Sequence, residues 1–265
     1  MAQEPTVPSC CVTGFAWSGT PQGKTITFPE CSGGQAYVTG SNNKVAILLV
    51  HDLLGWKFSN SRLLADHLAS EIPATIYMPD FFGGEELPQN LIQNLVDSLT
   101  FPAAEPVLQA YVGRNQRHIR EPEIFESARR LRREYEKLGT IGYCFGGWAV
   151  FRLGAADNIV EGKPLVDAIS TGHPSWLTKE DIAGVGVPVQ VLAPEHDPVY
   201  TPELKEYTFK EVLRKGVSFD YQHFPGVHHA CFTRGNPDIE GERDAMERGK
   251  NAAVAWFRQT LLDGK

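Results

Sequence analysis

Residues 45–50, with the sequence Val-Ala-Ile-Leu-Leu-Val, form an uninterrupted apolar run between polar turns. A strand without a polar face is buried on both sides, as in a parallel sheet covered by helices. Further strands are predicted at 74–78, 140–143, 165–170, 188–192 and 217–224. Helices are predicted between strands, notably over 122–138, 202–214 and 244–262. Strands that alternate with helices predict an α/β fold with a mostly parallel central sheet and helices on both faces.

The chain of 265 residues shows no internal repeat, low-complexity tract or linker, so we expect a single domain over 1–265. Residues 1–43 are rich in Gly, Ser, Thr, Pro and Gln and predict an irregular N-terminal segment with short strands. Residues 81–120 carry several prolines and weak periodicity, which predicts an insertion with short helices that lies over the sheet; whether it acts as a lid stays open at this point. Pro122 is predicted to open the next helix, with Gly139 just after its end.

The composition places the chain among ordinary globular proteins, with 42% hydrophobic and 22% charged residues. A net charge of -7 argues against nucleic acid or an anionic membrane as a partner. The N-terminus lacks the features of a signal peptide, and no run approaches the ~20 apolar residues of a membrane span. The cysteines are too few and too irregular for a disulfide framework or a zinc site: Cys10, Cys11, Cys31, Cys144 and Cys231. We therefore expect a soluble, cytoplasmic protein with reduced thiols and no metal.

The segment 141–147, Ile-Gly-Tyr-Cys-Phe-Gly-Gly, matches the G-x-S-x-G nucleophile elbow with Cys144 in place of serine. Glycines suit this pattern because side chains two residues on either side of the nucleophile would collide where a strand turns directly into a helix. The turn points the sulfur at a helix N-terminus, which favours the thiolate, and the Phe145 N–H faces a developing oxyanion. A core cysteine behind a glycine turn would look the same. The position between a predicted strand and a predicted helix favours the nucleophile.

An acid and a histidine follow in the order that the α/β-hydrolase fold requires. Asp197 comes after the strand at 188–192, at the carboxyl edge of the sheet, with Glu195 as the alternative acid. His228 and His229 follow the strand at 217–224, and these residues alone leave the choice between them open. Adjacent histidines in a loop rarely chelate one ion, so we predict no metal site there. The other histidines are interpreted mostly as surface or structural residues: His51, His67, His118, His173, His196 and His223.

With these segments identified, the chain resembles the dienelactone hydrolase family, and more closely its fungal members. The resemblance covers nearly the whole sequence and rests on these marks: Cys10-Cys11, 19–23 (Gly-Thr-Pro-Gln-Gly), 51–55 (His-Asp-Leu-Leu-Gly), 78–83 (Met-Pro-Asp-Phe-Phe-Gly), the 142–147 elbow, His173-Pro174-Ser175, Asp197, and His229 before Arg234-Gly235. It implies an α/β-hydrolase fold, no cofactor, and a triad of Cys144, Asp197 and His229. Counting back from Arg234-Gly235 selects His229, although Ala230-Cys231 replaces the usual Gly-Phe.

The resemblance also assigns residues around the triad. The oxyanion hole would consist of the backbone N–H groups of Leu53 and Phe145. Asp52 stands where bacterial relatives have a glutamate that helps to convert the cysteine into thiolate, and it is one methylene shorter. Arg234 resembles an arginine associated with binding of a substrate carboxylate.

These residues predict hydrolysis by acyl transfer, in which the Cys144 thiolate attacks a small-molecule ester or enol lactone. A second hypothesis is a thioesterase or lactonase of secondary metabolism that acts on a polyketide intermediate, because fungal relatives occur beside such pathways. Aromatic residues either line its apolar pocket or pack in the core: Trp56, Phe58, Phe82, Tyr111, Trp148 and Trp176. A third hypothesis is a non-catalytic protein in which Cys144 senses redox state.

Overall fold

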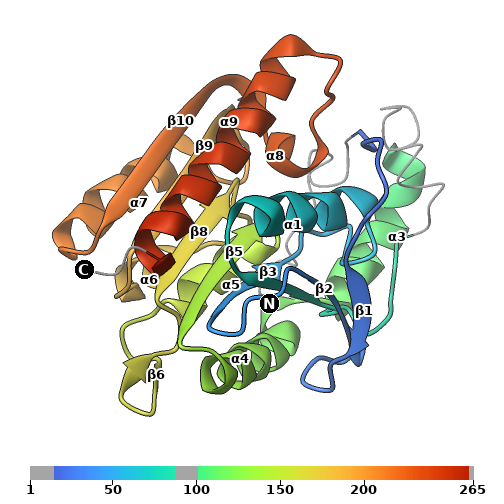
Figure 1. The fold of residues 1–265 in the computed structure, drawn as a ribbon. Coiled ribbons are helices and arrows are strands. Elements are labelled where there is room, and N and C mark those ends of the chain that lie inside the picture. The colour runs from blue at the N-terminus through green and yellow to red at the C-terminus, as the bar shows by residue number, and fades with distance from the viewer. Residues whose placement is uncertain (1–14, 88–100, 263–265) are drawn as a thin grey trace.

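The computed structural model describes residues 15–87 and 101–262. Its centre is an eight-stranded sheet in the order β1-β2-β4-β3-β5-β8-β9-β10 (Figure 1). The strands are β1 (Lys24–Thr27), β2 (Gln35–Thr39), β3 (Val45–Val50), β4 (Thr75–Pro79), β5 (Lys137–Tyr143), β8 (Ala168–Gly172), β9 (Val189–His196) and β10 (Phe219–His228). From β4 to β10 neighbouring strands are parallel, whereas β2 pairs antiparallel with both β1 and β4. The predicted mostly parallel α/β architecture is confirmed.

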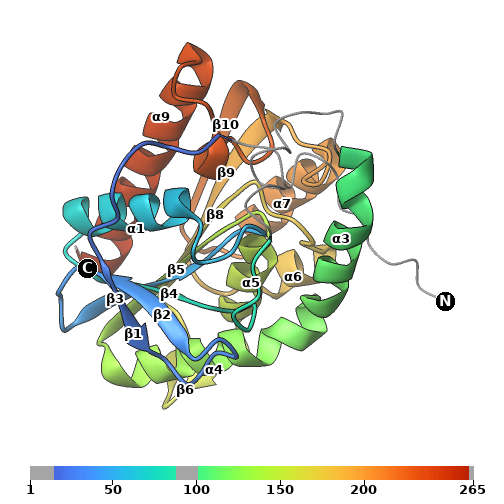
Figure 2. The ribbon, with the colours of Figure 1, turned by 90° about the vertical axis from the view of Figure 1, so that its right-hand side faces the viewer.

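Helices cover both faces of this sheet. Figure 2 shows α1 (Ser59–Glu71) and α9 (Glu240–Phe257) on one side, and α4 (Arg117–Glu134), α5 (Gly146–Leu153) and α6 (Lys179–Gly184) on the other. The side chains of β3 alternate between two core clusters, with Ala46, Leu48 and Val50 facing one and Val45, Ile47 and Leu49 facing the other. The apolar run at 45–50 is therefore buried on both faces, as its sequence predicts. The remaining elements are α3 (Phe101–Arg114), α7 (Pro202–Arg214), α8 (Cys231–Arg234), the hairpin of β6 (Ile159–Val160) and β7 (Lys163–Pro164), and a π-helical turn, Arg258–Leu262.

Two predicted helix boundaries are wrong. Helix α4 begins at Arg117, so Pro122 lies inside the helix and does not open it. The helix ends at Glu134, and the chain then extends so that Lys137 pairs with Val45 of β3. Gly139 consequently lies within β5, where an added Cβ would come within 2.7 Å of the Phe257 ring. Glycine here reflects close packing under the last helix, which the local pattern did not distinguish from a helix end.

The N-terminal and insertion segments are described in part. Within 1–43, β1 and β2 form the antiparallel edge of the sheet, and Cys10-Cys11 lies outside the described residues. Within 81–120, α3 and the start of α4 follow a turn region at 81–87, and residues 88–100 lie outside the described part. The lid remains a prediction. In the described ranges no helix has the length and apolar character needed to cross a membrane.

Candidate active site

Cys144 follows β5 directly, near the middle of the sheet, and its backbone has a left-handed φ of 48°. This conformation costs a residue with a side chain about 1–3 kcal/mol and is typical of functional sites. The flanking glycines are required by contact: an added Cβ would lie 2.2 Å from the Gly146 carbonyl oxygen at Gly142, and 2.2 Å from the Val50 carbonyl oxygen at Gly146. Helix α5 begins at Gly146. The segment therefore has the strand-turn-helix form predicted for a nucleophile elbow.

Asp197 and His229 meet at the carboxyl ends of β9 and β10. The strand register pairs His228 with His196, and the His229 N–H donates to the His196 carbonyl at 3.0 Å. The next side chains are then adjacent, and His229 Nδ1 lies 2.9 Å from Asp197 Oδ2, with neither side chain exposed. His229 also hydrogen-bonds the Cys144 side chain. The structure brings together the three side chains that the sequence named in this order.

The alternatives to this pair lie elsewhere. His228 is exposed and packs on the His196 ring at a centroid distance of 4.9 Å. Glu195 is exposed as well, and its carboxylate accepts a hydrogen bond from the Gly226 N–H at 2.7 Å. His229 therefore contacts Asp197, whereas Glu195 supports the loop before His228.

The electrostatics of the site favour a charged His229. Burial lowers its pKa, but the charge of Cys144 and the hydrogen bond with Asp197 outweigh burial and raise that pKa to about 10. Burial alone would raise the pKa of Asp197, yet the hydrogen bond from His229 and those from the Val199 and Tyr200 N–H groups hold it below its ordinary value. Both N–H groups donate to Asp197 Oδ1 at 2.9 Å. A thiolate-imidazolium pair is consistent with these shifts.

The candidate oxyanion donors come from two strand ends. Leu53 follows β3 and Phe145 follows Cys144, and both residues are buried. Neither backbone N–H donates to any residue in the described part of the chain. N–H groups of this kind are the donors that hold a developing oxyanion in hydrolases, so Leu53 and Phe145 remain the candidates for this role. The Tyr111 hydroxyl donates to the Leu53 carbonyl at 3.2 Å and helps to hold this loop.

Asp52 and Arg234 form a fully buried ion pair. Arg234 Nε lies 3.1 Å from Asp52 Oδ2, and both side chains are 0% exposed. Asp52 also accepts from the Leu54 N–H at 2.8 Å and from the Thr233 hydroxyl at 3.1 Å. Burial raises the pKa of Asp52, and Arg234 partly offsets this effect. The sequence pointed to Asp52 and Arg234 separately, and their pairing is visible only in the fold.

Aromatic side chains surround the elbow. The Phe82 ring lies 4.9 Å from that of Phe145, with Tyr111 at 5.4 Å from Phe82 and Trp176 at 5.6 Å from Phe145, all in edge-to-face geometry. Phe82 is therefore next to the elbow. Trp56, another of the aromatic residues predicted either to line a pocket or to pack in the core, lies in the core cluster on the α1 and α9 side, under the Arg62 guanidinium at 4.8 Å.

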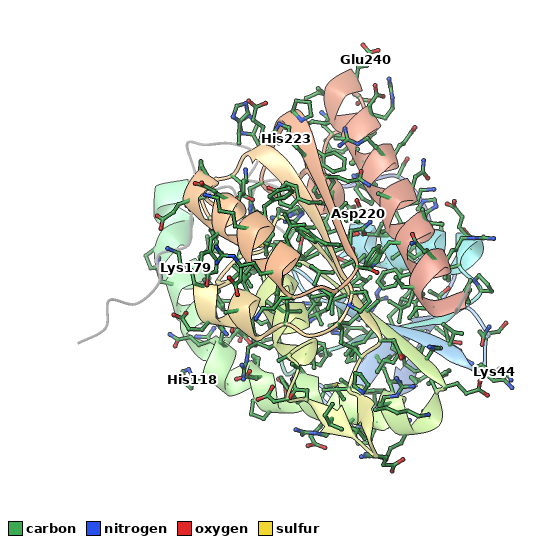
Figure 3. The ribbon with its side chains drawn as sticks, turned by 90° about the vertical axis from the view of Figure 1, so that its left-hand side faces the viewer. Lys44, His118, Lys179, Asp220, His223 and Glu240 are labelled. Atoms are coloured by element: carbon green, nitrogen blue, oxygen red, sulfur yellow. The ribbon has the colours of Figure 1, made fainter. Side chains whose placement is uncertain are left out.

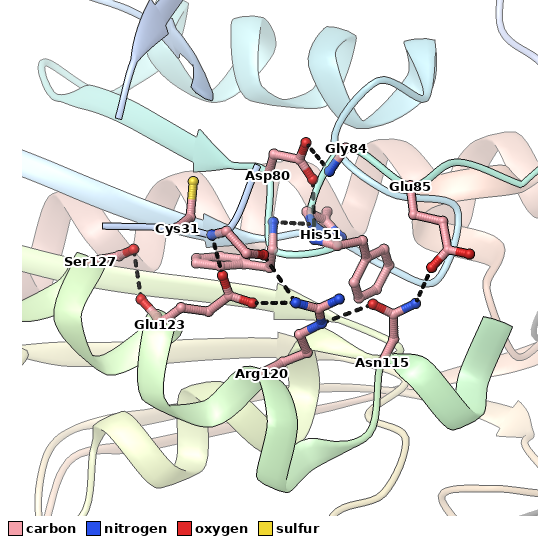
Figure 4. A network of polar contacts seen from close by, with 12 residues as sticks. Cys31, His51, Asp80, Gly84, Glu85, Asn115, Arg120, Glu123 and Ser127 are labelled. Atoms are coloured by element: carbon pink, nitrogen blue, oxygen red, sulfur yellow. Dashed lines mark hydrogen bonds and ion pairs between the residues drawn. The ribbon is translucent and has the colours of Figure 1, made fainter. Parts of the chain in front are cut away.

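A buried polar network supports the loop that carries Leu53. His51 Nδ1 lies 2.9 Å from the Asp52 carbonyl oxygen, and its Nε2 faces the Phe81 N–H at 3.4 Å (Figure 4). Figure 4 also shows Arg120 joining Asn115 to Glu123 at the start of α4. His51 therefore links the end of β3 to the residue after Asp80, and Arg120 donates to the Ser32 hydroxyl at 3.0 Å, which joins the β1-β2 connection to α4. His51 thus has the structural role that the sequence suggested.

Two buried side chains near Cys144 and His229 were not among the predicted site residues. Ser175 Oγ lies 3.3 Å from Cys144 Sγ. The His173 ring lies 4.8 Å from that of His229, and neither of its ring nitrogens has a hydrogen-bond partner among the described residues. Their position after a predicted strand was the signal that could have found them. The His173-Pro174-Ser175 mark was noted only as a resemblance.

The other histidines are dispersed. His67, His118, His196 and His223 are exposed, and Figure 3 shows His118 and His223 at separate places on the molecule. In the described ranges, no three His, Cys, Asp or Glu side chains are grouped so that they could hold a metal ion.

Comparison with known proteins identifies the family to which the chain belongs. The family model of the dienelactone hydrolase family matches residues 35–261, from β2 to the final turn. The chain belongs to the dienelactone hydrolase family. Among curated relatives of this dienelactone hydrolase-like chain, hydrolase tropI of Talaromyces stipitatus is 30% identical over 262 residues, covering 96% of this chain and 97% of that protein.

A further curated protein and a solved structure extend the comparison with the dienelactone hydrolase family. A carboxymethylenebutenolidase homolog of Rattus norvegicus is 26% identical and covers 86% of this chain and 88% of its own length. The crystal structure of a putative dienelactone hydrolase from Klebsiella pneumoniae superposes with a TM-score of 0.64 at 15% identity, over 90% of this chain and 98% of that one. At this identity the likeness shows the α/β-hydrolase fold alone.

Proposed function

We propose that this protein hydrolyses an activated ester or an enol lactone through an acyl-cysteine intermediate. The observation that carries the proposal is the buried chain of contacts from Cys144 through His229 to Asp197, beside the N–H groups of Leu53 and Phe145. Cys144 acts as nucleophile, His229 transfers the proton, and Asp197 orients His229 and stabilises its positive charge. Membership of the dienelactone hydrolase family supports this class of reaction.

The first step is acylation. The Cys144 thiolate attacks the carbonyl carbon, and the oxyanion accepts hydrogen bonds from Leu53 and Phe145, each worth about 3–4 kcal/mol where a comparable donor was removed in another enzyme. The carbon-oxygen bond of the ester then breaks, and the leaving oxygen takes the proton of His229. This step leaves a thioester on Cys144 and a neutral imidazole.

The second step is hydrolysis of the thioester. Neutral His229 accepts a proton from water as the water oxygen attacks the thioester carbonyl. The carbon-sulfur bond breaks, the acid leaves, and the thiolate-imidazolium pair is restored. Because thiolate is itself a good leaving group, a tetrahedral intermediate proceeds forward only when the alcohol or enol leaves readily. The site is therefore suited to enol lactones, thioesters and activated esters, and poorly suited to amides.

A second candidate substrate is a bulky planar acyl group, such as a polyketide lactone or thioester. The half-buried Trp176 ring, which packs edge-to-face on Phe145 next to Cys144, favours this class, because flat apolar groups stack against aromatic side chains. The catalytic steps are the same for both classes.

The test is turnover of p-nitrophenyl acetate and of a dienelactone by the wild type and by Cys144→Ala, with intact-mass detection of an acyl adduct. The matched control is Cys31→Ser, because the Cys31 thiol is also buried but donates hydrogen bonds to the Phe28 and Gln35 carbonyls. We expect turnover and an adduct in the wild type and the control, and neither in Cys144→Ala. Turnover by Cys144→Ala at the wild-type rate would refute a cysteine nucleophile. Reversible oxidation of Cys144 without turnover of any ester would support a redox sensor instead.

A further inference from the structure

The loop that follows β8 is fastened to the nucleophile through its backbone. The Cys144 N–H donates to the Gly172 carbonyl at 3.2 Å, and the Ser175 N–H donates to the Cys144 carbonyl at 2.8 Å. Between and beyond these contacts, His173 and Trp176 have left-handed φ angles of 40° and 55°. Residues with side chains rarely adopt this region, and they do so mainly where the surrounding structure holds them for a function.

The loop directs one hydroxyl at the nucleophile. Ser175 is 4% exposed, and its Oγ lies 3.3 Å from Cys144 Sγ. In the described part of the chain the sulfur is the sole hydrogen-bond partner of this hydroxyl. A buried hydroxyl without a partner is destabilising, so this contact accounts for a serine at this position.

The direction of the hydrogen bond follows from where the proton resides. In the proposed reaction Cys144 is a thiolate beside protonated His229, so the sulfur is the acceptor in its 3.3 Å contact with Ser175. The Ser175 hydroxyl is both donor and acceptor, so it donates to the thiolate. Hydrogen bonds to an ionised acceptor are stronger than those between neutral groups.

We propose that Ser175 is a further catalytic residue, whose hydroxyl stabilises the Cys144 thiolate by a direct hydrogen bond. This inference rests on the proposed function. The Cys144 thiolate then accepts hydrogen bonds from His229 and Ser175. These bonds hold the Cys144 rotamer and increase the fraction of Cys144 that is thiolate at neutral pH. When the thioester forms, the sulfur loses its charge and this hydrogen bond weakens. It strengthens again as the thiolate leaves during hydrolysis, so Ser175 also assists the departure of sulfur.

The experiment measures the thiol itself as well as turnover. The pH dependence of iodoacetamide alkylation is followed at Cys144 by peptide mass mapping, and kcat/KM is measured with p-nitrophenyl acetate. The variants are Ser175→Ala and the isosteric pair Ser175→Thr and Ser175→Val, which differ in the hydroxyl. The control is Ser170→Ala, which removes a buried hydroxyl of β8 that donates to Gln190 at 2.7 Å and not to Cys144.

Loss of the hydroxyl in Ser175→Ala and Ser175→Val should move the alkylation profile about one pH unit upward and lower kcat/KM at pH 7 about 10-fold, equivalent to about 1.4 kcal/mol. The deficit should shrink at high pH, where the thiolate forms without assistance. Ser175→Thr and Ser170→Ala should follow the wild type. Overlapping alkylation profiles for Ser175→Thr and Ser175→Val would overturn the proposal, even if Ser175→Ala fails to fold. A wild type without ester turnover refutes the proposed function, while the alkylation profile still tests Ser175.

Discussion

Removal of one partner from the buried Asp52-Arg234 pair should destabilise the protein strongly. Arg234→Met keeps most of the side-chain length and removes the charge. It leaves the Asp52 carboxylate, 0% exposed, with the Leu54 N–H and the Thr233 hydroxyl as its remaining hydrogen bonds. A buried ion pair broken in this way typically costs about 3–5 kcal/mol, because the remaining charge has lost both water and its counterion.

Replacement of both partners should cost much less. In Asp52→Asn combined with Arg234→Met no net charge stays buried, and such replacements are often close to neutral. The double variant should therefore be more stable than Arg234→Met alone. The matched surface control is Arg243→Met, because the Arg243-Asp244 contact of 3.6 Å is exposed and is worth about 0–1 kcal/mol.

Urea unfolding followed by circular dichroism checks these magnitudes. With a slope of about 3 kcal/mol per M, a loss of 3–5 kcal/mol lowers the midpoint by about 1–1.7 M. The loss should be largest at pH 8 and smaller at pH 5. Burial raises the pKa of Asp52, and a carboxyl group with a raised pKa favours the folded state at low pH and loses that contribution as pH rises. A loss below about 1 kcal/mol at pH 8, or a double variant no better than Arg234→Met, would refute the reasoning.

Two further predictions concern Asp197 and His229, the proposed catalytic pair. Asp197→Asn should keep the fold, because an amide oxygen still accepts from the Val199 and Tyr200 N–H groups. It should lower kcat/KM by about 10²- to 10⁴-fold, because a neutral amide neither orients His229 nor stabilises its positive charge. An unchanged unfolding midpoint is the control, and turnover close to that of the wild type would contradict the role of Asp197. The turnover rate of the wild type should fall as pH rises through about 10, the raised pKa of His229, because deprotonated His229 cannot donate a proton to the leaving oxygen. The same raised pKa stabilises the folded state below the ordinary histidine value, and this contribution is lost as pH rises through about 10; an alkaline limb near pH 7 would argue against the ion pair.

The sequence by itself determined the architecture and the strand-turn-helix form of the segment around Cys144. The run at 45–50 is buried on both faces, and Pro202–Arg214 forms the predicted helix with the same bounds. Each follows from residues that are neighbours in the sequence. The strand follows from its unbroken apolar run, and the helix from the Thr201 N-cap followed by proline. The elbow was also recognisable from its local sequence. Gly142 is required by close contact with the Gly146 carbonyl of the same segment, and Gly146 by close contact with Val50 of the adjacent strand.

Tertiary structure decided which side chains meet. The sequence pattern alone left open the choice between His228 and His229 as the partner of Asp197. The register of β10 on β9 turns His229 toward Asp197 and leaves His228 exposed. The same holds for Ser175, which reaches Cys144 because β8 pairs beside β5 in the sheet. Strand order and register arise from packing between segments far apart in the chain, and periodicity within a segment carries no information about its partner.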